Sequence, residues 1–206
     1  MKKEKWIEWA TEIQAIGQTG LEYCKDVYDK ERYERLREIA SEIMEQYTQI
    51  PTDQIKDLFC NEKGYQTPKV DVRAVIVKDH KILLIKQKEE QEWAIPGGWA
   101  DFNLSVKENV AKEAKEEAGL IVNPYKIIAI QDRRKHNKPV LAYTIYKIFV
   151  LCEVIEGKFE ENSETEESEF FELEKLPKLS IDRNTKEQIA MCIEAAENED
   201  WMTIFD

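Results

Sequence analysis

The stretch Lys112-Glu113-Ala114-Lys115-Glu116-Glu117-Ala118-Gly119-Leu120 decides the fold prediction, because it gathers three carboxylates at helical spacing. Glu113, Glu116 and Glu117 stand at positions i, i+3 and i+4, so they project from one face of a helix about one turn apart. Clustered carboxylate oxygens suit magnesium or manganese. The alternative is an ordinary solvated helix face on which the two lysines of the stretch relieve the repulsion.

The residues around this stretch predict where its helix begins and ends. Ser105 is followed three residues later by Glu108, which is the pattern of a capping box at a helix start. Gly119 stands where a helix would end in a left-handed residue. Gly97-Gly98 forms a turn in the loop before the helix. We therefore expect a helix of about 14 residues with a glycine turn beside it.

With the preceding glycine, this stretch resembles the signature of the Nudix family. That signature is glycine, five residues, glutamate, seven residues, then Arg-Glu-aliphatic-x-Glu-Glu-x-Gly-aliphatic, and seven of its nine fixed positions match when Ala114 is accepted as aliphatic. The departures are Leu104 for the first glutamate and Lys112 for the arginine. Lysine keeps the charge but loses the planar, two-pronged hydrogen bonding. The three glutamates are intact, so we expect an active enzyme.

The resemblance implies a metal site and a general base. Glu113, Glu116 and Glu117 are expected to bind Mg²⁺, or Mn²⁺, with the carbonyl of Gly97 or Gly98 as an added ligand. Bound cations would neutralise a diphosphate and activate a water molecule. The acidic segment 162–167 resembles the late Nudix segment that supplies a base, and its candidates, which the sequence cannot separate from ordinary surface acidity, are Glu164 and Glu166.

The remaining periodicity predicts an α+β protein with two domains. Residues 6–60 show only helical spacing of apolar residues, with a third short helix at residues 51–59. A strand hairpin is expected over residues 70–85, further strands at 127–130, 143–154 and 170–173, and a helix near 186–196. Together with the family resemblance, this predicts a helical domain over residues 1–66, for docking or dimerisation, and a Nudix α/β/α sandwich with a mixed sheet over residues 67–206.

The helical extension and several later segments resemble one bacterial subgroup of the Nudix family. This resemblance implies hydrolysis of CDP-choline to CMP and phosphocholine as the first expectation, and of ADP-ribose to AMP and ribose 5-phosphate as the alternative. A nucleotide-binding module without catalysis, and a secondary activity on RNA ends, stay open as other classes. A helical stripe containing Trp6, Ala10, Ile13 and Leu21 favours a homodimer through the N-terminal helices.

Four other residues are candidates for substrate binding. Arg73, Arg133 and His136 could contact a phosphate or a base, although a structural ion pair is the more common role of any one of them. Trp99 follows the glycine turn and could line a pocket for a base or a quaternary ammonium group through cation–π attraction.

Composition limits the partners and the compartment. The net charge of −12 makes nucleic acid an unlikely main ligand, because such affinity depends on lysine and arginine neutralising phosphates. The four cysteines show no paired spacing for zinc or redox chemistry. No apolar run approaches the roughly 18 residues of a membrane helix, and the first residues include acids where a signal peptide would be apolar. We therefore expect a cytoplasmic protein with no membrane partner.

Overall fold

The computed structural model describes residues 5–48, 55, 63–139, 141 and 143–206. They form two compact units, one of Met1–Pro68 with Leu141–Thr144 and the other of Lys69–Val140 with Ile145–Asp206. We call the first the N-terminal unit and the second, which contains the residues that the sequence predicts to be catalytic, the catalytic unit.

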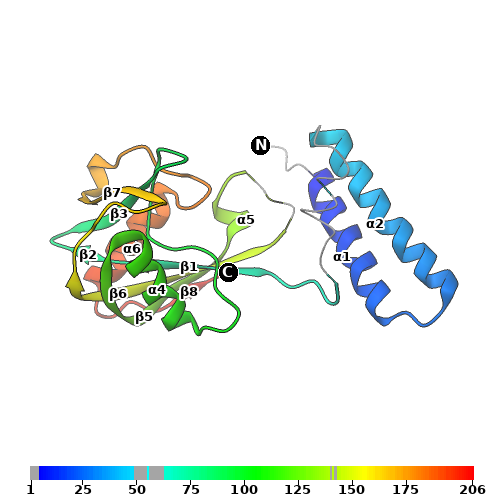
Figure 1. Cartoon of the computed structure of the whole chain (residues 1–206), viewed down its shortest axis with the longest axis horizontal. Coiled ribbons are helices and arrows are strands. Elements are labelled where there is room, and N and C mark those ends of the chain that lie inside the picture. Colours follow the sequence, from blue (N-terminus) through cyan, green and yellow to red (C-terminus); the bar gives the residue numbers. More distant parts are fainter. Residues whose placement is uncertain (1–4, 49–54, 56–62, 140, 142) are drawn as a thin grey trace. The chain divides into compact units, whose positions relative to one another are not determined.

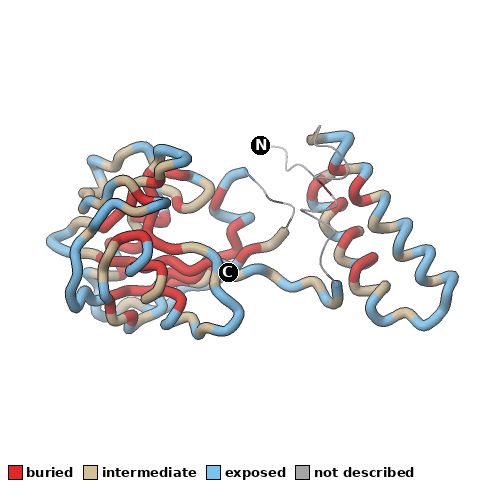
Figure 2. The backbone as a smooth tube through the Cα atoms, in the orientation of Figure 1, coloured by how far each residue is buried: buried red, intermediate tan, exposed pale blue. Residues whose placement is uncertain are grey.

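The N-terminal unit is built on the helices α1, Lys5–Tyr23, and α2, Val27–Thr48. These helices pack along each other, and their buried positions recur at helical spacing (Figure 2). At the open end of the pair, the rings of Trp6 and Tyr47 stack with their centroids 5.0 Å apart. The predicted helix over residues 51–59 lies outside the described residues, except for the buried Ile55.

The catalytic unit combines eight strands with three α-helices among its described residues (Figure 1). Its strands are β1 Lys69–Val75, β2 Val77–Lys78, β3 Lys81–Gln87, β4 Trp93–Ala94, β5 Leu120–Asp132, β6 Ile145–Gly157, β7 Thr165–Phe171 and β8 Ile204–Phe205. Its helices are α4 Val106–Ala118, α5 Arg133–His136, the 3₁₀ turn η1 Leu173–Lys175, and α6 Lys186–Glu197.

The strands form two sheets, of which the first is mixed and the second is antiparallel. The first has the order β1-β6-β5-β8, in which β1 lies parallel to β6, and β5 antiparallel to it. In the second sheet, β3 pairs with β2, β4 and β7, all antiparallel. One mixed and one antiparallel sheet, with helices on both sides, confirm the predicted α+β class.

The two apolar clusters of the catalytic unit show why α4 and α6 occupy different layers. Successive strand residues point to opposite faces of a sheet. In β1, Val72 and Ala74 therefore join the cluster that contains α4, whereas Val75 joins the cluster that contains α6. Each helix seals one face of the strands, which is the sandwich that the sequence predicts.

The predicted hairpin over residues 70–85 needs a correction. Only two residue pairs, Val77–Ile82 and Lys78–Lys81, join its arms as strands. The first arm mostly belongs to the other sheet, where β1 pairs with β6 over seven residues. The alternating pattern identified the strands, but local sequence does not encode which distant strand each one pairs with.

Candidate active site

Helix α4 carries the three glutamates and has the ends that the sequence predicts. The Ser105 side chain accepts a hydrogen bond from the backbone N–H of Glu108, whose carboxylate accepts one from the backbone N–H of Ser105. At the other end Gly119 adopts a left-handed conformation with φ of 68° and bonds back to the last turn. Both caps fix the register of the helix and thus the direction of each carboxylate.

The glycine turn lies directly against the carboxylates of α4. The backbone N–H of Gly97 donates to Glu117 at 2.7 Å, and a Cβ placed on Gly98 would lie 3.1 Å from an oxygen of Glu113. The carbonyl of Gly98 accepts a hydrogen bond from the N–H of Val72 at 2.9 Å. Of the two predicted carbonyl ligands, Gly97 is therefore the better candidate, because the Gly98 carbonyl is committed to β1.

Glu113 and Glu117 form a buried pair of acids, with exposed fractions of 9% and 4%. Burial, and then the charge of Glu117, raises the pKa of Glu113 to about 7. Burial also raises the pKa of Glu117, although the Gly97 N–H and Arg73 oppose that shift. Two buried carboxylates at this spacing are an unfavourable arrangement that a bound cation would relieve.

The ammonium group of Lys112 lies among three carboxylates. It is 2.8 Å from Glu116 and 3.6 Å from both Glu113 and Asp101. Glu116 is thus paired with Lys112, and in the described part of the chain no three Asp, Glu, His or Cys side chains converge as a ready metal site. The position nevertheless attracts a cation, here one from the chain itself, so the donor set fits a hard divalent ion.

Arg73, predicted to bind substrate, is buried in β1. Its guanidinium donates to both carboxylate oxygens of Asp71 and to the carbonyl of Ile95. The Asp71 carboxylate also lies 3.2 Å from the ammonium of Lys147, which is itself buried. The structure therefore places Arg73 in a buried ion cluster and gives it no exposed face for a substrate.

The other three predicted binding residues have recorded contacts with groups other than the three glutamates. Arg133 is buried and donates to the carbonyls of Pro139 and Asp182. A ring nitrogen of His136 pairs with the carboxylate of Asp206. Trp99 is half exposed, and its backbone bridges to that of Asp71. These contacts give Arg133 and His136 structural partners, while Trp99 keeps an exposed ring near the glycine turn.

The structure separates the two candidate bases. Glu166 accepts a hydrogen bond from Gln91 and lies 3.3 Å from Lys86. The pairing of β3 with β7 shifts register between Lys86 and Gln87, and Glu166 lies at this irregularity. Glu166 is thus paired with Lys86 and Gln91, whereas the next residue of β3, Gln87, reaches Glu117 at 3.4 Å.

Glu164 is exposed and lies in the segment that contacts the end of α4. Two residues before it, the side chain of Asn162 donates to the backbone carbonyl of Glu116 at 3.0 Å. The backbone N–H of Glu164 in turn donates to the side chain of Asn162. Glu164 is therefore the better placed of the two candidates.

Two residues at the site were not predicted from the sequence. The amide of Gln87 is 3.4 Å from one oxygen of Glu117, and the guanidinium of Arg183 is 4.0 Å from the same oxygen. Gln87 is the last residue of an apolar strand, and a polar residue at a strand end is only weak evidence for a functional site. Arg183 immediately precedes the Asn184-Thr185 start of α6, and nothing in its own neighbourhood of the sequence points to α4.

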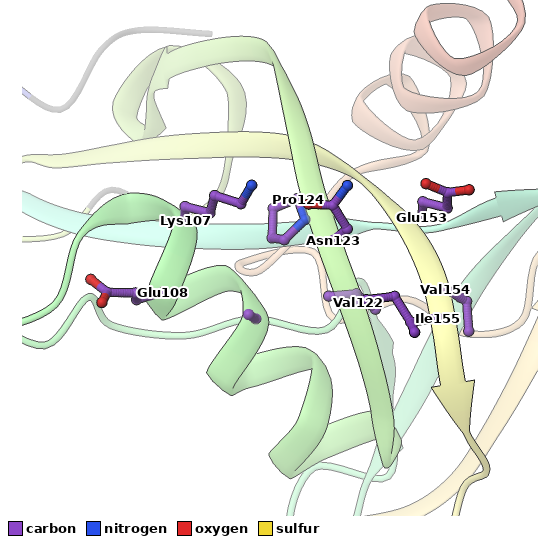
Figure 3. Close-up of a pocket in the computed structure, with 9 residues that line it drawn as sticks. Lys107, Glu108, Val122, Asn123, Pro124, Glu153, Val154 and Ile155 are labelled. Carbon is purple, nitrogen blue, oxygen red and sulfur yellow. The ribbon is translucent and has the colours of Figure 1, made fainter.

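A shallow hollow of about 680 Å³ lies elsewhere on the catalytic unit, between α4 and the strands β5 and β6 (Figure 3). Helix α4 contributes Lys107, Glu108 and Ala111 to it. At 100° per residue these positions face roughly away from Glu113 and Glu117. The hollow is therefore separate from the carboxylate site.

Comparison with known protein families shows to which family the chain belongs. The model of the NUDIX domain matches residues 67–192. The chain belongs to the Nudix family. A second model, described as a UDP-X-like, N-terminal oligomerisation domain, matches residues 4–59. With this family assignment the chain is a Nudix pyrophosphohydrolase, of a family that generally uses divalent metal ions.

Relatives and solved structures agree with this assignment. A Bacillus subtilis protein named "Putative ADP-ribose pyrophosphatase YjhB" is 43% identical over 98% of this chain and 97% of its own length. The structure of an ADP-ribose pyrophosphatase from Streptococcus suis is 47% identical, covers 68% of this chain and all of its own, and has a TM-score of 0.63. That of a UDP-X diphosphatase is 33% identical, covers both chains completely and has a TM-score of 0.64. Among the described residues, no helix is long and apolar enough to cross a membrane.

Proposed function

We propose that this Nudix enzyme cleaves the diphosphate of a nucleoside diphosphate joined to a second group, using Mg²⁺ or Mn²⁺ held by Glu113, Glu116 and Glu117. The observation that carries the proposal is the buried pair of Glu113 and Glu117 against the glycine turn. The cation would neutralise the diphosphate and make the attacking water more acidic. Glu116 would exchange its bond with Lys112 for the cation.

The chain's other groups have supporting roles in this proposal. The Gly97 carbonyl is an added oxygen ligand, and Glu164 accepts the proton of the attacking water. Glu166 stays as the weaker candidate base, because its carboxylate is already paired with Lys86 and Gln91. Lys112, released from Glu116, can lie against the anionic product.

ADP-ribose is the first proposed substrate. The supporting observation is that relatives matching 98% and 68% of this chain carry the name ADP-ribose pyrophosphatase. The full-length likeness to a UDP-X diphosphatase supports UDP-linked compounds as the second group to test. CDP-choline, the first expectation from the sequence, is named by none of these relatives and stays a prediction, as does a location in the cytoplasm.

The direct test is a substrate panel of ADP-ribose, CDP-choline, a UDP-sugar and a capped RNA fragment, each with Mg²⁺, with Mn²⁺ and with EDTA. We expect EDTA-sensitive release of AMP from ADP-ribose at the highest kcat/KM. Glu116→Gln should abolish turnover, while Glu194→Gln, an exposed change on α6, should leave it intact. Nucleotide binding that persists without any turnover in the wild-type protein would favour the binding-module alternative.

We also propose that the N-terminal unit joins two copies of the chain. Of the predicted stripe, Ala10 is buried within the unit, and Trp6 stacks on Tyr47. A different set on α1 remains exposed at seven-residue intervals: Trp9, Ile16 and Tyr23, with exposed fractions of 58%, 51% and 66%. Such a heptad-spaced apolar stripe suits helix-to-helix packing between copies, in line with the matched description of an oligomerisation domain.

A further inference from the structure

The loop before α6 places a positively charged side chain, that of Arg183, beside the carboxylate site. Two backbone hydrogen bonds of 2.9 Å fix this loop to β4: the N–H of Trp93 donates to the carbonyl of Lys178, and the carbonyl of Trp93 accepts from the N–H of Ser180. Further along, the side chain of Asn184 accepts from the N–H of Ile95 at 2.8 Å. Arg183 lies between these anchors, so the position of its backbone is well defined, and its side chain extends toward Glu90 and Glu117.

Arg183 is held only loosely by its acidic neighbours. Its guanidinium lies 3.7 Å from Glu90 and 4.0 Å from Glu117, distances beyond those of hydrogen bonds. Its side chain is 27% exposed. The guanidinium is thus near the carboxylates, open to solvent and not saturated with hydrogen bonds.

The other arginines of the catalytic unit are committed elsewhere. Arg73 and Arg133 are buried on Asp71 and on backbone carbonyls, and Arg134 pairs with Asp132. Lys112 contacts Glu113 and Glu116, whereas Arg183 contacts Glu117. Lys112 and Arg183 therefore contact different carboxylates of the cluster.

We propose that Arg183 binds the diphosphate of the substrate and donates hydrogen bonds to the phosphate oxygens on which negative charge develops; this inference rests on the proposed function. Once a bound divalent cation neutralises the carboxylate of Glu117, that carboxylate no longer attracts the guanidinium of Arg183. Its planar group can then turn to a phosphate, for which two-pronged donation is well suited. Arg183 lies outside the helix signature, so only the tertiary fold brings it to the site.

The test compares Arg183→Gln and Arg183→Lys with the wild type, using ADP-ribose and CDP-choline with Mg²⁺. Lys178→Gln is the matched control, because it removes one positive charge from the same loop at an exposed ion pair with Glu92. We expect Arg183→Gln to lower kcat/KM about 10²-fold, equally for each substrate that the wild type cleaves. Arg183→Lys should recover part of this loss, and the control should match the wild type.

Three outcomes would overturn the inference. The first is a decrease in the kcat/KM of Arg183→Gln of less than about threefold, and the second is a decrease for only one of the cleaved substrates. The third is a decrease that disappears when the Mg²⁺ concentration is raised, because Arg183 would then only position Glu117. Thermal unfolding of each variant separates misfolding from lost binding. If the wild type cleaves nothing, the proposed function fails, and the inference is then judged by Mg²⁺-dependent binding of ADP-ribose: Arg183→Gln must weaken it about tenfold, and equal or absent binding overturns it.

Discussion

The backbone N–H of Gly97 donates a 2.7 Å hydrogen bond to the carboxylate of Glu117, which ties the loop before α4 to the last turn of that helix. The bond requires the backbone of Gly97 to pass close to β1 with φ of 147°. A Cβ at this position would lie 2.0 Å from the carbonyl oxygen of Val72. Glycine is therefore required here by space and by conformation, and the acid site depends on it.

Gly97→Ala should destabilise the protein by about 3 kcal/mol and remove activity, because overlap with Val72 adds to the conformational strain. Gly64→Ala is the control: Gly64 also has a positive φ, of 83°, but open space around its Cβ position. It should cost about 1 kcal/mol from strain alone. Urea unfolding of both variants measures the difference, and equal losses would contradict the role of the overlap.

Glu113→Gln should stabilise the metal-free protein while abolishing turnover. Burial raises the pKa of Glu113 to about 7, so its folded form resists ionisation. The unfolded chain ionises near pH 4.5, and the wild type therefore loses stability as pH rises from there through 7. Gln does not ionise, so the advantage of the variant should grow between pH 5 and pH 8, to roughly 1–3 kcal/mol.

Thermal unfolding in EDTA at the two pH values measures this advantage. A constant difference between wild type and Glu113→Gln would show that ionisation of Glu113 is not its source. Added Mg²⁺ should then raise the unfolding temperature of the wild type much more than that of the variant, since the variant lacks one proposed ligand.

Sequence reasoning succeeded where the signal is local and failed where it depends on distant pairing. The capping box at Ser105 and the left-handed Gly119 set the limits of α4 correctly, because both act within one helical turn. The pairing of β1 with β6 and the approach of Arg183 to Glu117 join segments more than 60 residues apart. No periodicity within either segment specifies such contacts.

The substrate-binding candidates show a second limit of the sequence. Arg73 and Arg133 have the right charge for a phosphate, but whether an arginine faces solvent or a buried partner is decided by the face of the strand or helix on which it falls. Arg73 shares its face of β1 with Asp71, two residues away, and the two pair inside the protein. Charge in a sequence therefore predicts the chemistry of a residue better than its accessibility.

Lys147 should make stability depend on pH in the alkaline range. Burial, and then the charge of Arg73, lowers the pKa of Lys147 to about 7, against about 10.5 in the unfolded chain. Between these values the unfolded chain binds more protons, so stability contributed by this group rises with pH. Lys147→Met removes the titration and should flatten this rise.

The measurement is the free energy of unfolding in urea at pH 7.5, 8.5 and 9.5 for both proteins. The difference between wild type and Lys147→Met should change by up to about 1.4 kcal/mol per pH unit in favour of the wild type. Comparing the two proteins cancels the titration of thiols and tyrosines. A difference independent of pH would mean that Lys147 stays protonated in the fold, held by Asp71.

Ile16→Glu tests the proposed pairing of two copies through α1. Ile16 is the middle residue of the exposed stripe, so a buried charge there would cost several kcal/mol in a helix-to-helix interface and little in a lone chain. We expect light scattering at micromolar concentration to give twice the chain mass for the wild type and the single chain mass for the variant. Met202→Glu makes the same kind of change at an 81% exposed apolar residue of the catalytic unit and should leave the mass doubled. A wild-type protein with the mass of one chain would reject the proposal, and dissociation by Met202→Glu alone would move the interface to the catalytic unit.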